Sequence, residues 1–103
     1  MAMGARADGV VAPMRRVLSP VGDLDLLTVD HLRTSLANAV ASSADDIVID
    51  LTGVEHVDIV ALSTILATAD SLRERGRSLH VSGARRDLRR VCALLRADDI
   101  LLD

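Results

Sequence analysis

The chain has 103 residues, enough for one domain with its own hydrophobic core. Apolar residues make up 50% of it and charged residues 26%, a balance typical of globular proteins rather than disordered ones. The net charge of −3 lacks the positive excess of a nucleic-acid binder. Phe, Tyr and Trp are absent, so no aromatic side chain is available to stack on a base. We therefore expect no nucleic-acid partner.

Cofactor, metal and catalytic sites find no support in the sequence. Cys92 is the single cysteine, which excludes an internal disulfide and a cysteine-rich zinc site. His31, His56 and His80 fall in different predicted elements without metal-binding spacing, and no glycine-rich phosphate loop occurs. We expect a protein that is not an enzyme and uses no cofactor or metal. No apolar run approaches the roughly 18 residues of a membrane span, and no signal-peptide core is visible, which predicts a cytoplasmic protein without membrane insertion.

The chain begins with a small, polar segment, and we expect residues 1–9 to form a frayed tail. A single domain is predicted over residues 10–103. Residues 10–21 contain short apolar pieces that predict one or two strands. Pro13 and Pro20 confine these strands to an edge or to strand ends, because proline cannot donate a ladder hydrogen bond.

A turn at Gly22-Asp23-Leu24-Asp25 precedes the first predicted helix. Thr28 is the expected N-cap of that helix. Apolar residues then recur with helical spacing on one face, namely Val29, Leu32, Leu36 and Val40. The run Ile47-Val48-Ile49-Asp50-Leu51 is short, β-branched and nearly continuous, which is typical of a strand buried on both faces.

A loop over residues 52–56 leads to a second predicted helix, whose apolar stripe is formed by Leu62, Ile65, Leu66, Ala69 and Leu72 and which ends near Gly76. Residues 78–82 alternate like a strand, residues 88–95 form a third helical pattern, and residues 100–102 complete the predicted sheet as an edge strand. This order predicts an α/β sandwich with a mixed, mostly parallel sheet of about four or five strands and helices packed against it.

One basic cluster stands out, consisting of Arg85, Arg86, Arg89 and Arg90. Acidic residues are interspersed with it, and we interpret the cluster as the solvated face of the third helix. Binding of an anion or an acidic partner is the alternative.

Four markers in this order resemble the STAS domain family (sulphate transporter and anti-sigma factor antagonist), over roughly residues 15 to 102. They are the turn Gly22-Asp23-Leu24-Asp25 with Thr28 after it, the strand and its exit at residues 47–54, Val57-Asp58 followed by Leu62, and Gly76 followed by the strand Leu79-His80-Val81. The resemblance implies a STAS-type sandwich. It also implies the function of the bacterial anti-sigma factor antagonists, which is to bind an anti-sigma factor of the serine-kinase type.

In that family the docking surface comprises the loop before helix two, the first turns of that helix and the neighbouring turn. Carried onto this sequence, the resemblance marks eight candidate partner-binding residues: Asp25, Thr28, Asp58, Ile59, Val60, Ala61, Ser63 and Thr64. Asp58 is also the expected N-cap of helix two. For Asp25, the residue pattern itself indicates only a turn residue.

The sequence departs from the family at the phosphorylated serine, whose position is occupied by Ile59. Val60 and Ala61 follow, so the nearest downstream hydroxyls are those of Ser63 and Thr64, one turn into the predicted helix. In the family, a phosphate at this serine places two negative charges in the interface and breaks the complex. Because Ile59 has no hydroxyl to phosphorylate, we predict that docking is not switched by phosphorylation at this loop. Ile59 and Val60 either tuck into the core or form an exposed apolar patch typical of a protein contact.

Two other functions within the family stay open. One is a structural STAS subunit that braces the ATPase of a lipid-transport ABC system. The other is a domain that senses a nucleotide or another small anion at the N-terminus of helix two. The helix that most family members place after the last strand has no counterpart before Asp103, and an apolar face left uncovered there would favour a homodimer.

Overall fold

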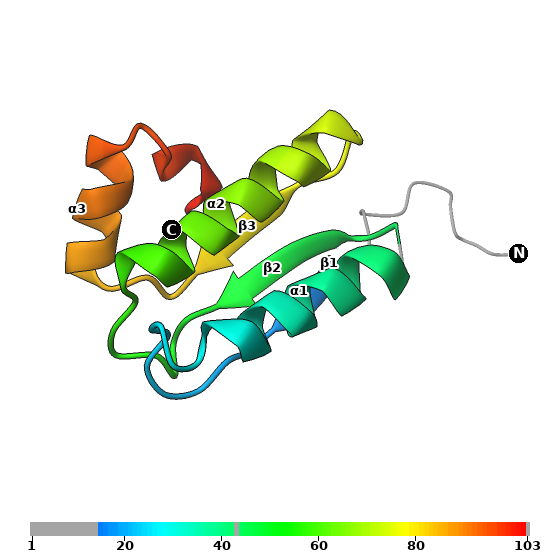
Figure 1. Ribbon diagram of the computed structural model, residues 1–103. Coiled ribbons are helices and arrows are strands. Elements are labelled where there is room, and N and C mark those ends of the chain that lie inside the picture. Colours follow the sequence, from blue (N-terminus) through cyan, green and yellow to red (C-terminus); the bar gives the residue numbers. More distant parts are fainter. Residues whose placement is uncertain (1–14, 43, 103) are drawn as a thin grey trace, which may run out of the picture.

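The computed structural model describes residues 15–42 and 44–102, so the predicted tail and the first part of the predicted first strand lie outside the described residues. The elements follow the predicted alternation of strands and helices (Figure 1). In chain order they are β1 (Arg15–Leu18), α1 (Val29–Ser42), β2 (Asp46–Asp50), α2 (Ile59–Glu74), β3 (Leu79–Ser82), α3 (Arg86–Leu94) and the short 3-10 helix η1 (Asp98–Ile100).

The three strands form a parallel sheet in the order β1-β2-β3. β2 is the central strand, and its residues Ile47, Val48 and Ile49 are all buried. This confirms the interpretation of the apolar run at residues 47–51. The parallel pairing requires a crossover between successive strands, and α1 and α2 provide it.

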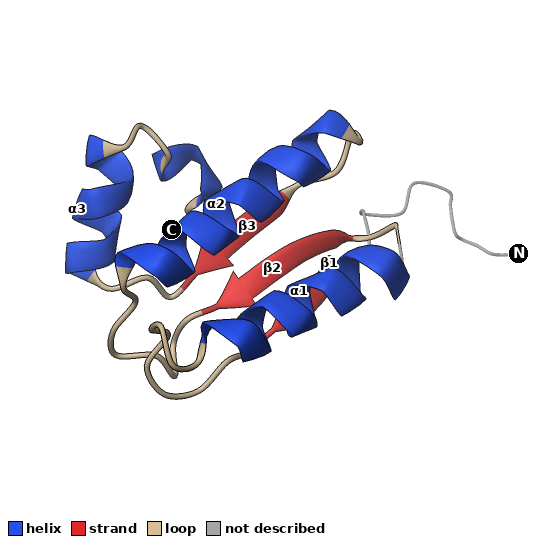
Figure 2. Ribbon diagram, in the orientation of Figure 1, coloured by secondary structure: helices blue, strands red, loops and turns tan. Residues whose placement is uncertain are grey.

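Helices α1 and α2 cover the same face of the sheet, and the core lies between them and the strands (Figure 2). Ile47 and Ile49 of β2 and their register partners Leu79 and Val81 of β3 point into this core, because paired residues of a parallel sheet face the same side. The helices contribute the predicted apolar stripes, which include Leu36 of α1 and several residues of α2: Leu62, Ile65, Ala69 and Leu72.

The end of the chain differs in detail from the predicted edge strand. Asp98–Ile100 form η1, and of the predicted strand only Leu101 pairs, through one parallel bridge to Val81. The backbone N–H of Leu102 donates to the carbonyl of Val81. Ile100 is buried in the core, so this segment covers the β3 edge with very little regular strand.

The carboxyl ends of the strands lie at one end of the molecule, on the left of Figure 1. The first turns of α1 and α2 are found at the same end, and α3 stands just beyond β3. Gly83, between β3 and α3, has a φ of 70°, and a Cβ there would lie 2.6 Å from the hydroxyl oxygen of Thr52. The loops after β2 and β3 are therefore in direct contact at this end.

Candidate docking site

Two loops at the carboxyl end of the sheet are joined by backbone hydrogen bonds. The N–H of Leu24 donates to the carbonyl of His56 at 2.9 Å, and the N–H of Asp58 donates to the carbonyl of Leu24 at 2.9 Å. Leu24 and Val57 thus form an isolated parallel bridge, and the side chain of Leu24 is buried. These contacts hold the turn before α1 against the loop before α2, although about thirty residues of chain separate them.

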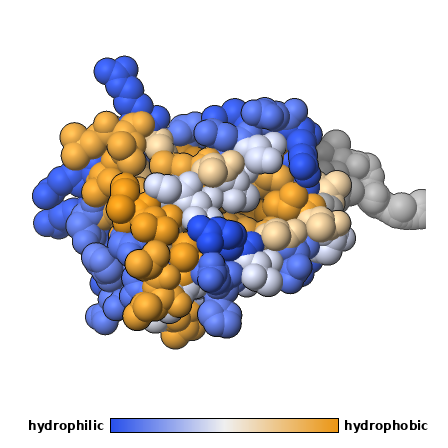
Figure 3. All heavy atoms as spheres, viewed as in Figure 1, coloured by the Kyte–Doolittle hydropathy of each residue, from blue (hydrophilic) through white to orange (hydrophobic). Residues whose placement is uncertain are grey.

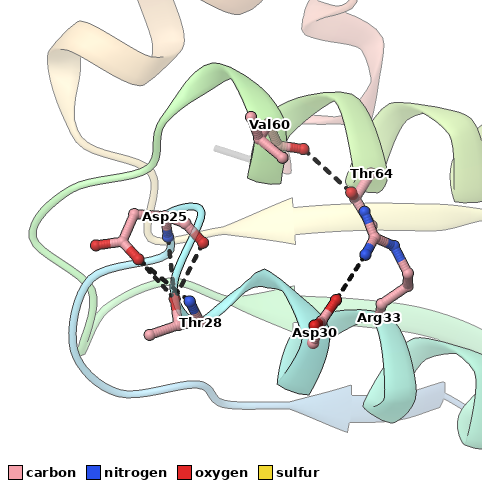
Figure 4. A network of polar contacts seen from close by, with 6 residues as sticks. All are labelled: Asp25, Thr28, Asp30, Arg33, Val60 and Thr64. Carbon is pink, nitrogen blue, oxygen red and sulfur yellow. Dashed lines mark hydrogen bonds and ion pairs between the residues drawn. The ribbon is translucent and has the colours of Figure 1, made fainter.

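Asp25 and Thr28 cap the start of α1 reciprocally. The Asp25 carboxylate accepts from the N–H groups of Leu27 (2.9 Å) and Thr28 (3.2 Å), while the Thr28 hydroxyl oxygen accepts from the Asp25 N–H at 3.0 Å. This is a capping box, in which two orphan donors at a helix start are satisfied by each other's side chains. Thr28 directly precedes α1, the position expected of an N-cap, but its hydroxyl oxygen accepts from the N–H of Asp25 before the helix. Figure 4 shows the pair just ahead of α1.

Asp58 caps α2 as predicted and also ties the two loops together. One carboxylate oxygen, Oδ1, accepts from the N–H of Ala61 at 3.0 Å, and the other, Oδ2, accepts from the N–H of Leu26 at 3.2 Å. Both oxygens therefore bind backbone donors of this chain. Asp58 thus adds a side-chain bond to the backbone bonds of Leu24 that hold this turn beside α2.

The residues after Asp58 divide between surface and core. The side chain of Ile59 is 61% exposed, Val60 is half-buried against the core, and Ala61 is fully buried. Of the two predicted alternatives, exposure on the surface holds for Ile59 and packing against the core holds for Val60. Of these three side chains, that of Ile59 is the exposed one, whereas Ala61 offers no surface.

The hydroxyl groups one turn further along α2 differ from each other. Thr64 is half-buried, and its hydroxyl donates to the carbonyl of Val60 at 3.1 Å within the helix (Figure 4). Ser63 is exposed. Neither residue occupies the first turn that Asp58 caps.

Two apolar residues complete the exposed surface around Asp58, and the sequence reasoning did not single them out. Leu26 is 70% exposed and Leu27 is 89% exposed, inside the turn that Asp58 and Asp25 hold. The sequence did contain an indication of them, because two successive leucines between Asp25 and Thr28 precede α1 and do not belong to its apolar stripe. We use the name docking face for the surface formed by Leu26, Leu27, Asp58 and Ile59.

Two groups have pKa values shifted by their surroundings. The hydroxyl of Thr52, 2.6 Å away, and then its backbone N–H lower the pKa of Asp50. Burial raises the pKa of Cys92, with a further contribution from the charge of Asp98. Both groups lie outside the docking face. Within residues 15–42 and 44–102, no cluster of three or more His, Cys, Asp or Glu side chains is placed to hold a metal ion.

No helix in the described part of the chain is long and apolar enough to cross a membrane. The side chain of His56 is exposed, and its main-chain carbonyl accepts from the N–H of Leu24.

The parallel sheet, the helices on one face and the exposed loops at its carboxyl end define a small α/β domain. The sequence model of the STAS domain matches residues 6–102, and the chain therefore belongs to the STAS domain family. No curated protein sequence matches the chain.

Solved structures agree on the fold. The unphosphorylated anti-sigma factor antagonist SpoIIAA has a TM-score of 0.74 at 17% identity, covering 91% of this chain and 83% of its own. A putative anti-sigma factor antagonist from Thermotoga maritima has a TM-score of 0.72 at 19% identity, covering 84% and 75%. A sulfate transporter family protein from Wolinella succinogenes has a TM-score of 0.68 at 16% identity, covering 89% and 80%. At these identities the likeness establishes the fold alone.

Proposed function

We propose that this chain is a non-enzymatic binding module of the anti-sigma factor antagonist type, which docks through the docking face onto an anti-sigma factor of the serine-kinase type. The observation that carries the proposal is the exposure of Ile59 next to Leu26 and Leu27, around an Asp58 whose oxygens are both engaged. Apolar side chains held this rigidly outside the core are typical of a protein contact. The likeness to structures of SpoIIAA supports the choice of partner class.

The docking face can bind a partner without a phosphorylation switch in the first turn of α2. Ile59 carries no hydroxyl, and Ala61 is buried. The Thr64 hydroxyl is bonded inside the helix, where a phosphate would have to break that bond and turn outward. Binding is accordingly constitutive at this loop, and any regulation comes from the supply of the partner or from another surface.

The small-anion alternative fits this geometry less well. An anion at the N-terminus of α2 needs free backbone N–H donors. The Asp58 carboxylate already accepts from the N–H of Ala61, and its negative charge would repel a second anion. The exposed side chain at the adjacent position is that of Ile59, which offers no hydrogen bond.

A calorimetric titration against purified serine-kinase-type anti-sigma factors from the source genome tests the proposal. Burying an Ile or Leu side chain contributes about 1.5–3 kcal/mol, so Ile59→Asp and Leu27→Asp should each weaken binding by roughly tenfold to a hundredfold. Ala67→Asp is the matched control, because Ala67 is exposed on the same helix at about 12 Å along its axis from Ile59. Equal binding by wild type and Ile59→Asp would show that the docking face is wrongly assigned.

Phosphorylation is tested separately. Incubation of wild-type protein with the kinase and ATP, followed by mass spectrometry, should yield no phosphate on α2. The Ile59→Ser variant restores a hydroxyl at the position that follows the N-cap, and the same incubation should phosphorylate it and abolish binding. Phosphate on Ser63 or Thr64 of the wild-type protein, with loss of binding, would contradict the unswitched interface.

A further inference from the structure

A groove separates the start of α2 from α3, directly beside the docking face. Its volume is ≈ 220 Å³. The walls are mainly apolar and come from both sides: Val54, Ile59 and Leu62 from the α2 side, and Leu88 and Val91 from α3. The guanidinium Nε of Arg85 donates to the carbonyl of Val54 at 3.2 Å, which fixes the start of α3 against the α2 loop. This hydrogen bond therefore fixes the two sides of the groove relative to each other. Ile59 belongs both to the wall of the groove and to the docking face.

The outer side of α3 continues the apolar surface. Leu88 and Cys92 are buried, whereas Leu94 is 77% exposed and its neighbour Leu95 is 50% exposed. Val91 is partly exposed at the groove. Figure 3 shows apolar atoms gathered on the left of this view, over α3, the start of α2 and the turn before α1. Exposed apolar residues on two adjoining elements exceed what scattered surface leucines produce.

The charge on this side of the groove has the opposite sign to that of the whole chain. Residues 85–96 contain five arginines and one aspartate, a net charge of +4 from five minus one, while the chain carries −3. Arg86 and Arg90 are exposed on α3, and neither forms an ion pair with any residue in the described ranges. A partner that covers Val91 and Leu94 therefore meets positive charge that this chain does not neutralise.

We propose that the groove and α3 form a second half of the docking surface, which takes an acidic amphipathic helix of the partner. The apolar side chains of that helix enter the groove against Val91 and cover Leu94. Its carboxylates lie over Arg86 and Arg90. This inference rests on the proposed function, because it extends the docking face across Ile59, and it names the chemistry of the partner segment.

An anionic membrane also combines apolar and negative surface, but it fits this site less well. Interfacial membrane sites have one continuous apolar face flanked by basic residues, whereas the apolar surface here is divided by a groove. Near the start of α1, exposed Asp23 and Asp30 would repel the lipid headgroups. Glu55, Asp58 and Asp87 also line the groove, so a helix inserted there would face it with apolar side chains and place its own carboxylates over Arg86 and Arg90 on the outer side of α3.

The test uses two synthetic helical peptides with the same leucine stripe, one with Glu and the other with Lys at the remaining positions. Titrated into the ¹⁵N-labelled full chain, the Glu peptide should shift amide signals of α3 and of residues 54–59. It should bind about tenfold more tightly than the Lys peptide at low salt, with the difference shrinking as salt is added. The double variant Arg86→Glu with Arg90→Glu should reverse this preference. Leu94→Ser should weaken both peptides.

The variants change exposed positions, and Glu at position 86 suits the first turn of a helix, so the fold is retained and circular dichroism can verify it. Equal affinity for the two peptides overturns the inference, as does binding of phosphatidylglycerol vesicles through α3 without binding of the Glu peptide. Titration of the anti-sigma factor separates the two proposals. If Ile59→Asp abolishes its binding and the Arg86, Arg90 double variant leaves it unchanged, α3 is excluded and the docking face stands. If Ile59→Asp has no effect, the proposed function fails.

Discussion

Asp58 joins the two loops of the docking face through two hydrogen bonds, and two substitutions at this position distinguish the contribution of each bond. Asp58→Ala removes the N-cap bond to the N–H of Ala61 and the bond to the N–H of Leu26. Loss of an N-cap costs about 1 kcal/mol, and loss of a hydrogen bond to a charged acceptor costs roughly 1.5 kcal/mol. We therefore expect Asp58→Ala to lower the free energy of unfolding by about 2–3 kcal/mol.

Asp58→Asn divides this effect. The amide has one acceptor oxygen, so the variant can retain the N-cap bond but cannot accept from Leu26 as well. About half of the loss should remain. The partner should also bind more weakly, because the turn that carries Leu26 and Leu27 loses its side-chain bond to the α2 cap and keeps only the backbone bonds of Leu24.

Urea unfolding followed by circular dichroism measures the free energy of unfolding of both Asp58 variants. In thermal unfolding, a loss of 2–3 kcal/mol should lower the melting temperature by roughly 10 °C or more for a domain of this size. Asp30→Ala is the control, since Asp30 is exposed in the first turn of α1 and only pairs with Arg33 on the same helix. An Asp58→Ala protein as stable as the Asp30→Ala protein would refute the reasoning, as would an Asp58→Asn protein less stable than Asp58→Ala.

Three further predictions concern the scaffold. Gly83→Ala should destabilise the protein by roughly 1–3 kcal/mol more than Gly76→Ala in urea unfolding, because both have positive φ but only at Gly83 does a Cβ meet Thr52; equal losses would contradict this. Thr52→Val should raise the pKa of Asp50 in an NMR titration, and an unchanged pKa would contradict the assigned cause. Because the pKa of Asp50 is lowered in the folded state, its contribution to stability is present above the unfolded pKa near 3.8. That contribution disappears as the pH falls through the folded-state pKa. Cys92, buried and with a raised pKa, should react with iodoacetamide about a hundredfold more slowly in the folded chain than in urea, and rapid labelling in the folded state would show that α3 detaches.

Up to α3, the order and type of the described elements followed from the sequence alone, whereas η1 stands where the sequence predicted an edge strand. The stripe on α2, the continuous apolar run of β2 and the Asp58 cap are local patterns, in which the spacing of side chains along the chain decides the outcome. The absence of a hydroxyl at Ile59 is likewise a property of the sequence, and no tertiary contact alters it.

The surface of the site was decided by tertiary structure. Whether Ile59 or Val60 faces outward depends on how α2 lies on the sheet, and both are β-branched residues that the sequence pattern treats alike. Leu26 and Leu27 lie beside the start of α2 because the backbone bonds of Leu24 and the Asp58 carboxylate join two loops that are about thirty residues apart in sequence. The groove at α3 has the same origin, since Arg85 bonds to the carbonyl of Val54 across two loops. Contacts between residues distant in sequence follow from the packing of whole elements, and helical or strand periodicity does not predict them.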